Sequence, residues 1–410
     1  MNVSQRTLHL GTENAFSILR QVEDMRSRGK DVVNFCIGQP DFDTPKNIKR
    51  RAIQAIDEGK TGYTPSAGIP ELRKAVADHL TATRRIDVKP DDVVIGCGSK
   101  PFISYAILAV TDYGQGHEVL CPNPGYPIYE SQARAHGTIP VPIPLLEKNG
   151  YSIDIEYLER RINEKSRLLI LNSPHNPTGT VLEEEILEQI ADVVQKYDDL
   201  WVFSDEVYSR IIYDVKFTSI ASIRNMAERT IIVDAVSKTY AMTGWRIGFA
   251  ANRRLSSYIS RWVNNTDSCA AHPSQYAAVE AFKGPQTDVD EMVESYQKRR
   301  DLIVEGLNSI NGIECPRPRG AFYVWPNITG ACEITGAKDS EDFRQRLLDD
   351  AGVAVLSDIH FGDQNMGEGQ HIRFSFATSS EQIKEGVRRI AAYVNSAREL
   401  NTCQISLARY

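Results

Sequence analysis

A repeated alternation of short apolar segments and amphipathic helical stretches, beginning at Val93, constrains the fold of this chain more than any other feature. The segments are apolar on both faces, and helical stretches separate them. A parallel sheet buried between two layers of helices produces this pattern. The sequence therefore predicts an α/β fold with a mostly parallel, seven-stranded sheet sandwiched by helices. The expected strands are 93–95, 118–121, 139–143, 167–171, 200–203, 230–234 and 247–250.

The length of 410 residues is more than a single core usually serves, so two domains are expected. After about residue 290 the alternation is replaced by three helices and three strands in a mixed order, typical of an α+β unit. The predicted division is a large domain over 46–289 and a smaller α+β domain formed by 1–45 together with 290–410. Residues 400–410 are expected to be a loosely held tail. The expected helices are 286–308, 340–350 and 380–398, and the strands are 321–326, 353–356 and 371–376.

The composition excludes several classes of protein. A net charge of -7 argues against a nucleic-acid partner. Seven cysteines without a CxxC pair or a secretory signal indicate reduced thiols and a cytoplasmic location. Eight histidines show no spacing typical of a metal site, so no metal is expected. No apolar run approaches the length that crosses a bilayer, so no membrane association is expected either.

Polar turns follow five of the predicted strands at the point where each strand ends. Ligands of open α/β sheets bind at the carboxyl ends of the strands. Any one of these turns could merely cap its strand, but five along one edge predict a binding site. The turns contain Gly98-Ser99-Lys100, Asn123 to Pro127, Asn172 to Gly179, Asp205 and Lys238.

Lys238 follows the apolar segment that ends at Val233. Desolvation disfavours the charged form of a lysine, and an uncharged amine attacks carbonyl carbons to form a Schiff base. Ser237 and Arg246 add a hydroxyl and a guanidinium nearby in the sequence. The three groups together suit a phosphorylated aldehyde, although a lone lysine after a strand is more often an ordinary surface residue.

Six motifs carry a resemblance that covers nearly the whole chain, from about residue 30 to 395. In these motifs and their order the sequence resembles the class I/II aminotransferases, which are fold-type I enzymes dependent on pyridoxal 5'-phosphate (PLP). Within that family it is most similar to the bacterial aspartate aminotransferase type. The motifs are Gly-Gln-Pro-Asp-Phe-Asp-Thr-Pro (38–45), Pro-Gly-Tyr-Pro (124–127), Asn-Pro-Thr-Gly (176–179), Ser-Asp-Glu-Val-Tyr (204–208), Ser-Lys-Thr-Tyr-Ala-Met-Thr-Gly-Trp-Arg-Ile-Gly (237–248) and Ile-Arg-Phe-Ser (372–375).

The resemblance implies a catalytic role for Lys238, Asp205 and Tyr208. Lys238 would bind the PLP aldehyde and move a proton between the substrate and the cofactor. PLP acts as an electron sink when its ring nitrogen is protonated, and Asp205 would supply the carboxylate partner. Asn176 and Tyr208 would contact the phenolic oxygen of the ring, and Tyr126 would stack on its face.

The cofactor phosphate needs backbone N–H groups at a helix start and a cation. The resemblance assigns these contacts to Gly98, Ser99 and Lys100, which precede a predicted helix, and to Ser237 and Arg246. Arginine binds phosphate through two parallel hydrogen bonds.

Tyr63 matches a family tyrosine that reaches the phosphate of the neighbouring subunit. The resemblance therefore implies a homodimer with shared active sites. It also implies ping-pong transfer of an amino group between an L-amino acid and a 2-oxo acid. In relatives, a loop corresponding to His360-Phe361-Gly362 closes over the substrate.

Arg373 matches the arginine that holds the substrate α-carboxylate, assisted by Gly38 and Asn176. As a lone arginine in a strand it would equally suit an ion pair with the large domain. Lys100 occupies the position that meets the distal carboxylate in the aspartate type. That favours aspartate or glutamate as one partner, while the alternative is a lysine that only adds charge near the phosphate. His175, which precedes Asn176, departs from the usual pattern and leaves the substrate open.

Alternatives remain on sequence grounds. The substrate could be alanine, an aromatic amino acid or a specialised biosynthetic compound. Another PLP reaction on the same fold, such as β-elimination by a C–S lyase or ring formation by an aminocyclopropane-forming synthase, is a second alternative. A regulatory domain that binds PLP without turnover is a third, although the first 30 residues are too few for the DNA-binding region of such fusions.

Overall fold

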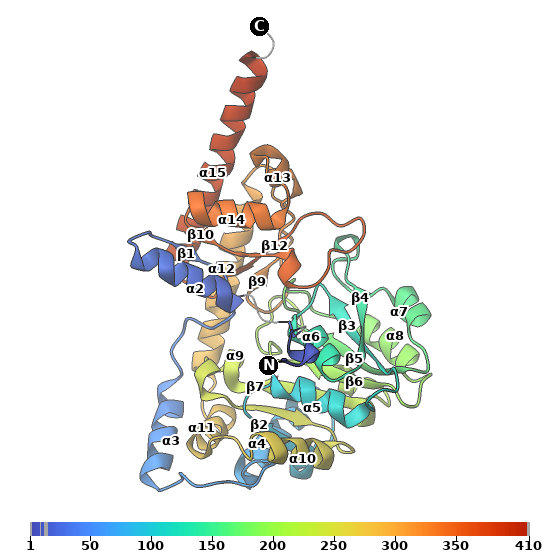
Figure 1. Cartoon of the computed structure of the whole chain (residues 1–410). Coiled ribbons are helices and arrows are strands. Elements are labelled where there is room, and N and C mark those ends of the chain that lie inside the picture. Colours follow the sequence, from blue (N-terminus) through green and yellow to red (C-terminus); the bar gives the residue numbers. More distant parts are fainter. Residues whose placement is uncertain (1, 9, 12–14, 408–410) are drawn as a thin grey trace.

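The computed structural model describes residues 2–8, 10–11 and 15–407, and its architecture is shown in Figure 1. A seven-stranded sheet with helices on both faces occupies the lower part of that view. The C-terminal elements, with two small sheets, lie above it. The predicted α/β architecture is confirmed.

All seven predicted strands of the large sheet are present, within two residues of the expected limits. Their order is β2-β8-β7-β6-β5-β3-β4, and only β8 runs antiparallel to its neighbours. A parallel connection usually needs a helical crossover of a dozen residues or more. The link between β7 and β8 has twelve residues but holds only the four-residue helix α9 (Val236–Thr239) and a 3-10 turn around Lys238, without a crossover helix, so β8 returns alongside β7. The strands are β2 (Val93–Gly96), β3 (Glu118–Asn123), β4 (Ile139–Pro144), β5 (Ser166–Asn172), β6 (Trp201–Asp205), β7 (Thr230–Ala235) and β8 (Gly248–Ala251).

Alternate residues of these strands pack into different helical layers, as expected from the two-residue repeat of a strand. Val94, Ile231 and Val233 belong to a core covered by α5 (Pro101–Val110), α6 (Ile128–Ala135) and α10 (Ser256–Thr266). Val93, Ile95 and Ile232 face the opposite layer. That layer contains α3 (Lys46–Asp57), α4 (Pro70–Arg84) and α11 (His272–Lys283), and α7 (Ile155–Arg161) and α8 (Glu184–Val194) extend it. The sheet is therefore covered on both sides.

The C-terminal part contains α12 (Thr287–Asn308), α13 (Thr329–Thr335), α14 (Ser340–Asp350) and α15 (Ser380–Leu407). The expected helices over 286–308 and 340–350 are confirmed. The last helix, however, runs to Leu407, so the expected helix end near residue 398 was wrong, and residues 400–407 of the expected tail are helical. No glycine or proline follows Gly386 to stop it. Residues 408–410 lie outside the described part.

The predicted strands of this part are present but short. β1 (Val33–Asn34) pairs with β10 (Val353–Ala354), and β12 (Ile372–Ser375) lies between β11 (Leu356–Ser357) and β9 (Tyr323–Val324). The N-terminal segment forms α1 (Gln5–Leu8) and α2 (Ala15–Ser27), and α2 buries Ile18 and Val22. Within residues 2–8, 10–11 and 15–407, no helix is long and apolar enough to cross a membrane.

Candidate active site

A cavity of about 570 Å³ lies at the carboxyl ends of the strands, between the large sheet and the C-terminal part. Most of the residues singled out in the sequence line it, although they come from positions 38 to 373. Gly98 and Tyr63 do not. The lining includes Gly38, Ser99, Lys100, Tyr126, Asn176, Asp205, Tyr208, Ser237, Lys238, Arg246 and Arg373. Two residues that sequence reasoning missed, Tyr129 and Tyr323, line it as well.

Lys238 lies in the short helix α9 (Val236–Thr239), directly after β7. Its Nζ donates a hydrogen bond of 2.5 Å to the carbonyl oxygen of Gly38, two hundred residues earlier in the chain. The same nitrogen lies 5.9 Å from the centre of the Phe322 ring. The amine is thus held inside the cavity between a backbone carbonyl and an aromatic side chain, where it can reach a bound carbonyl carbon.

Asp205 ends β6 and is 8% exposed. The hydroxyl of Tyr129 donates a hydrogen bond of 2.6 Å to its Oδ2, and the N–H of Val207 donates to Oδ1. Burial raises the pKa of Asp205 to about 6, against the opposing effect of the Tyr129 hydrogen bond. A buried carboxylate with this environment suits a partner that brings its own positive charge and donor.

Arg373 projects from β12 and lies over the ring of Tyr323, with 4.4 Å between its guanidinium carbon and the ring centre. It donates hydrogen bonds to Asn176 Oδ1 at 2.8 Å and to the Cys36 carbonyl at 2.6 Å. Its Nε is buried and has no hydrogen-bond partner among the described residues. The Tyr208 and Tyr323 hydroxyls lie 2.8 Å apart, and burial raises the pKa of Tyr208. The guanidinium therefore has donor capacity left for an anion in the cavity.

The turn before α5 forms a cradle with little room for side chains. Gly98 has φ +91°, and a Cβ built on it would lie 2.1 Å from Nη2 of Arg246. A Cβ on Gly248 would lie 2.4 Å from the backbone nitrogen of Ser99. Arg246 is held by the carbonyls of Thr243 and Cys97, at 2.9 and 3.1 Å. Backbone groups at a helix start beside a fixed guanidinium are suited to a phosphate.

His175 and Tyr63 lie away from this cavity. His175 is 3% exposed, contacts Thr178 through Nδ1 at 2.8 Å, and lines a separate small cavity. Burial lowers its pKa to about 3, so the ring is uncharged at neutral pH. Tyr63 is 90% exposed. Neither side chain contributes to the cavity wall of this single chain.

A lysine amine, a buried carboxylate and a cradle suited to phosphate surround one cavity, and this set of groups suits an enzyme that works on a phosphorylated aldehyde. PLP is such an aldehyde, and the donor set fits it. The ring nitrogen has an anionic partner available in Asp205, and the phosphate has the cradle beside Arg246.

Comparison with known proteins agrees with this class. Residues 30–390 match the family model described as aminotransferase class I and II. A probable aspartate/prephenate aminotransferase of Aquifex aeolicus is 38% identical over 95% of this chain and 97% of its own length. The aspartate aminotransferase of Bacillus subtilis is 33% identical over 96% of this chain and 99% of its own length.

Two solved structures are similar over nearly the whole chain. The aspartate aminotransferase of Rhizobium meliloti has a TM-score of 0.91 at 34% identity, with 96% of this chain and 99% of that chain covered. The aspartate aminotransferase of Thermus thermophilus with maleate has a TM-score of 0.89 at 32% identity, with 96% and 100% covered. The chain belongs to the class I and II aminotransferases. It is a PLP-dependent enzyme that acts on an amino acid and a 2-oxo acid, as the motifs predicted.

Proposed function

We propose that this aminotransferase takes aspartate or glutamate as one of its partners. The observation that carries the proposal is the presence of three cationic side chains around one cavity besides the lysine that would bind the aldehyde. Arg246 lies at the phosphate cradle, Arg373 lies between two aromatic rings, and Lys100 lies 5.6 Å from the centre of the Tyr126 ring. A dicarboxylic substrate on PLP brings three anionic groups, one for each cation. Relatives named aspartate aminotransferase support the same choice.

The residue roles are proposed as follows. Lys238 binds the aldehyde of the cofactor and, once substrate has replaced it, carries a proton from the substrate Cα through its Nζ. Asp205 accepts a hydrogen bond from the ring nitrogen and keeps that nitrogen protonated. Asn176 and Tyr208 orient the phenolic oxygen, while Tyr126 covers one face of the ring. When bound, PLP supplies the electron sink that makes the Cα proton acidic.

Arg373 is proposed to hold the substrate α-carboxylate. Its guanidinium lies between the rings of Tyr323 and Phe361, at 4.4 and 4.8 Å from their centres. Planar stacking of this kind fixes the plane in which its N–H groups can donate. Nη1 and Nη2 each carry a second N–H group, and these groups can therefore donate to a carboxylate in one defined orientation. Gly38 leaves room beside it, since a Cβ there would lie 1.9 Å from the Tyr323 hydroxyl.

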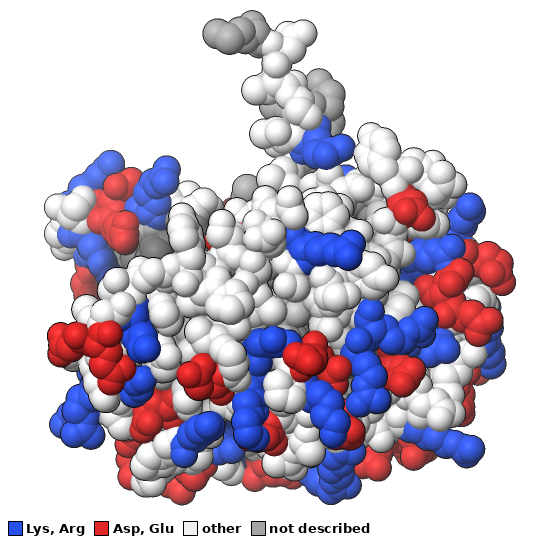
Figure 2. Space-filling view, turned by 90° about the horizontal axis from the view of Figure 1, so that it is seen from below, with Lys and Arg blue, Asp and Glu red and all other residues white. Residues whose placement is uncertain are grey.

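A homodimer is the proposed assembly, with Tyr63 reaching the phosphate site of the partner. Tyr63, Ile53, Ile56 and Tyr258 are large apolar or aromatic side chains that are all more than half exposed. Figure 2, which views the molecule from below Figure 1, shows a broad area with few charged side chains. An uncharged area of this kind is typical of a protein interface.

The division into a large domain over 46–289 and a small domain over 1–45 and 290–410 is likewise proposed. The seven-stranded sheet and the small C-terminal sheets lie on the two sides of the cavity, which supports this division. A cytoplasmic location is supported by the free cysteines at 36, 97, 121, 269, 315 and 332.

Borohydride reduction of the PLP-loaded protein, followed by peptide mass spectrometry, tests the central role. Cofactor mass is expected on Lys238, and Lys238→Ala is expected to lose both this attachment and turnover. The matched control is Lys216→Ala, which removes an exposed lysine outside the cavity. Normal turnover by Lys238→Ala would remove Lys238 from the mechanism. Release of pyruvate and ammonia from cysteine conjugates, without amino transfer, would indicate a C–S lyase instead.

A further inference from the structure

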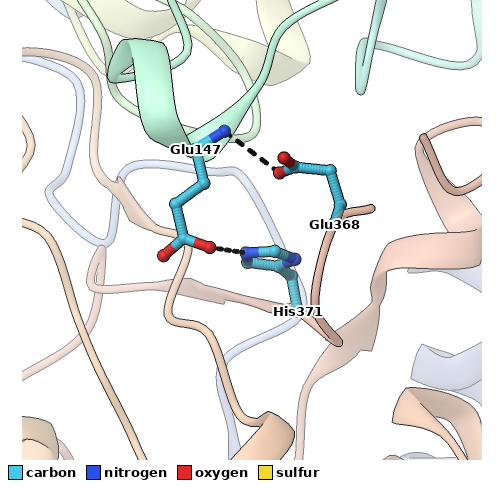
Figure 3. Close-up of side chains that lie close together, drawn as sticks. All are labelled: Glu147, Glu368 and His371. Carbon is cyan, nitrogen blue, oxygen red and sulfur yellow. Dashed lines mark hydrogen bonds and ion pairs between the residues drawn. The ribbon is translucent and has the colours of Figure 1, made fainter. Parts of the chain in front are cut away.

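A partly buried polar cluster joins the segment after β4 to the C-terminal part (Figure 3). Glu147 lies in the short helix η2 (Glu147–Asn149) after β4, and His371 directly precedes β12. We propose that the contact between Glu147 and His371 positions Arg373 for the substrate carboxylate, which makes both of them positioning residues of the reaction. The proposal rests on the role proposed above for Arg373.

Hydrogen bonds link the members of the cluster. Nε2 of His371 lies 3.2 Å from Oε2 of Glu147 and 2.9 Å from the hydroxyl of Tyr151. Asn327 donates to the same Glu147 oxygen at 2.8 Å, and the N–H of Glu147 donates to Glu368 at 3.0 Å. Glu147, Glu368 and His371 are close enough together to hold a cation. Because Asn327 donates to Oε2 of Glu147 and a ring nitrogen of His371 lies beside the same oxygen, contacts among these side chains account for the arrangement.

Tyr151 takes part through an unfavourable backbone conformation. Its φ is +59°, in the left-handed region that residues other than glycine rarely adopt. The side chain is buried, and its hydroxyl reaches His371 across the boundary between the two parts. Strained backbone of this kind persists where the surroundings enforce it, and it often marks a functional contact. The contact with His371 gives such a reason here.

A series of ring contacts connects His371 to the guanidinium of Arg373. The His371 ring lies parallel to Trp325, with 5.6 Å between centres and 5° between planes. Trp325 meets Phe361 edge-on at 5.3 Å, and Phe361 lies 4.8 Å from the guanidinium carbon of Arg373. His371 is also only two residues before Arg373 in the chain. A displaced His371 therefore moves both the strand that carries Arg373 and one of the two rings that enclose it.

Substrate affinity of the PLP-loaded enzyme tests the proposal. For Glu147→Ala we expect the dissociation constants of L-aspartate and L-alanine, followed by the cofactor spectrum, to rise together by roughly tenfold. Tenfold corresponds to about 1.4 kcal/mol of binding free energy. Both amino acids are affected equally because both present an α-carboxylate. The affinity for PLP is expected to stay within about twofold, since neither residue touches the cofactor cavity.

Two variants serve as controls. Glu147→Gln keeps an acceptor oxygen and is expected to recover most of the affinity. Glu159→Ala removes an ion pair of 2.7 Å with Lys196 that has no connection to Arg373, and it is expected to change nothing. Tyr151→Phe deletes only the hydroxyl against His371 and gives a second, milder test, with an expected rise of about threefold. Unchanged affinity in both Glu147→Ala and Tyr151→Phe would overturn the proposal.

A double-mutant cycle separates positioning from general destabilisation. If Glu147 acts through Arg373, Glu147→Ala has no further effect on amino-acid affinity once Arg373→Lys is present. A full tenfold loss in that background would show that Glu147 acts elsewhere, and the proposal would be wrong. Failure of the proposed function looks different, because Arg373→Lys alone would then leave amino-acid affinity unchanged.

Discussion

The burial of Asp205 predicts how the stability of the apo protein depends on pH. An ionised carboxylate suits a cationic ligand in the active site, but it destabilises the folded protein when no ligand is bound. The pKa of Asp205 rises from its ordinary 3.8 to about 6 through burial, with the Tyr129 hydrogen bond opposing the rise. In the folded apo protein, the carboxyl therefore keeps its proton over a pH range in which the unfolded chain has already lost it. The contribution of such a group to the free energy of unfolding is fully present below its pKa in the unfolded chain. It is lost as the pH rises through its pKa in the folded protein.

The magnitude follows from the difference of about two pH units between these pKa values. At about 1.36 kcal/mol per unit, ionised Asp205 costs the apo protein on the order of 3 kcal/mol at neutral pH. Most of this cost, about 2 kcal/mol, develops between about pH 4.5 and pH 7.5. Asp205→Asn removes the titrating group while it keeps an oxygen for the Tyr129 hydroxyl. Its stability relative to wild type is thus expected to increase by about 2 kcal/mol across this range.

Urea unfolding of both apo proteins between pH 4.5 and pH 7.5 measures this change. Only the change with pH in the difference in free energy of unfolding between the two proteins is interpreted. The amide also alters hydrogen bonding near Val207, and this adds a difference that does not depend on pH. Asp24→Asn, on the exposed surface of α2, is the matched control and is expected to show no such trend. The same Asp205→Asn protein is expected to bind PLP more weakly, since the ring nitrogen loses its anionic partner. A stability difference that is flat with pH would refute the reasoning.

Two further predictions concern charges at and behind the cavity. Arg84 is 2% exposed and bonds Glu206 at 2.7 Å and Asp234 at 3.1 Å, so Arg84→Ala leaves two buried carboxylates without their cation. We expect the free energy of unfolding, measured in urea, to fall by about 3–5 kcal/mol in Arg84→Ala and by less in Arg84→Lys. A decrease below about 1 kcal/mol in Arg84→Ala would contradict this. Lys100→Met is expected to raise KM for aspartate and glutamate at least about tenfold more than KM for alanine, since only the first two lose a charged partner. Equal increases for all three would assign Lys100 to the phosphate region instead.

The sequence predicted the large sheet well because its strands are defined by local patterns. Each apolar segment is bounded by turns, and most of them are followed by a helix that covers one face, so seven strands could be placed without any long-range information. The orientation of β8 was harder to predict, because it depends on the short link from β7 rather than on the strand itself. The length of α15 was missed for another reason: a polar C-terminal segment resembles a tail unless the absence of helix breakers is given weight.

The candidate site shows the same division between local and distant information. Ser237, Lys238 and Arg246 fall within one motif, and the structure brings them to one cavity. Tyr129 and Tyr323 were missed because their partners lie 76 and 115 residues away in the sequence. One signal was available for Tyr129, which follows Tyr126 by three residues and so lies on the same side of a helical turn. No comparable signal pointed to Tyr323.

The two consecutive acids at the end of β6 show how the fold separates structural charge from functional charge. Successive residues of a strand point to opposite faces, so Asp205 and Glu206 diverge. Glu206 is paired with Arg84 inside the protein and accepts hydrogen bonds from the hydroxyls of Ser204 and Ser219. Asp205 accepts hydrogen bonds from the neutral donors Tyr129 and Val207, and these bonds and the charge of Lys238 offset only part of the effect of burial, which raises its pKa. A fold that pairs one carboxylate with a buried arginine and leaves its neighbour at the cavity suits that neighbour to a cationic ligand, which supports the role proposed above for Asp205 at the ring nitrogen of PLP.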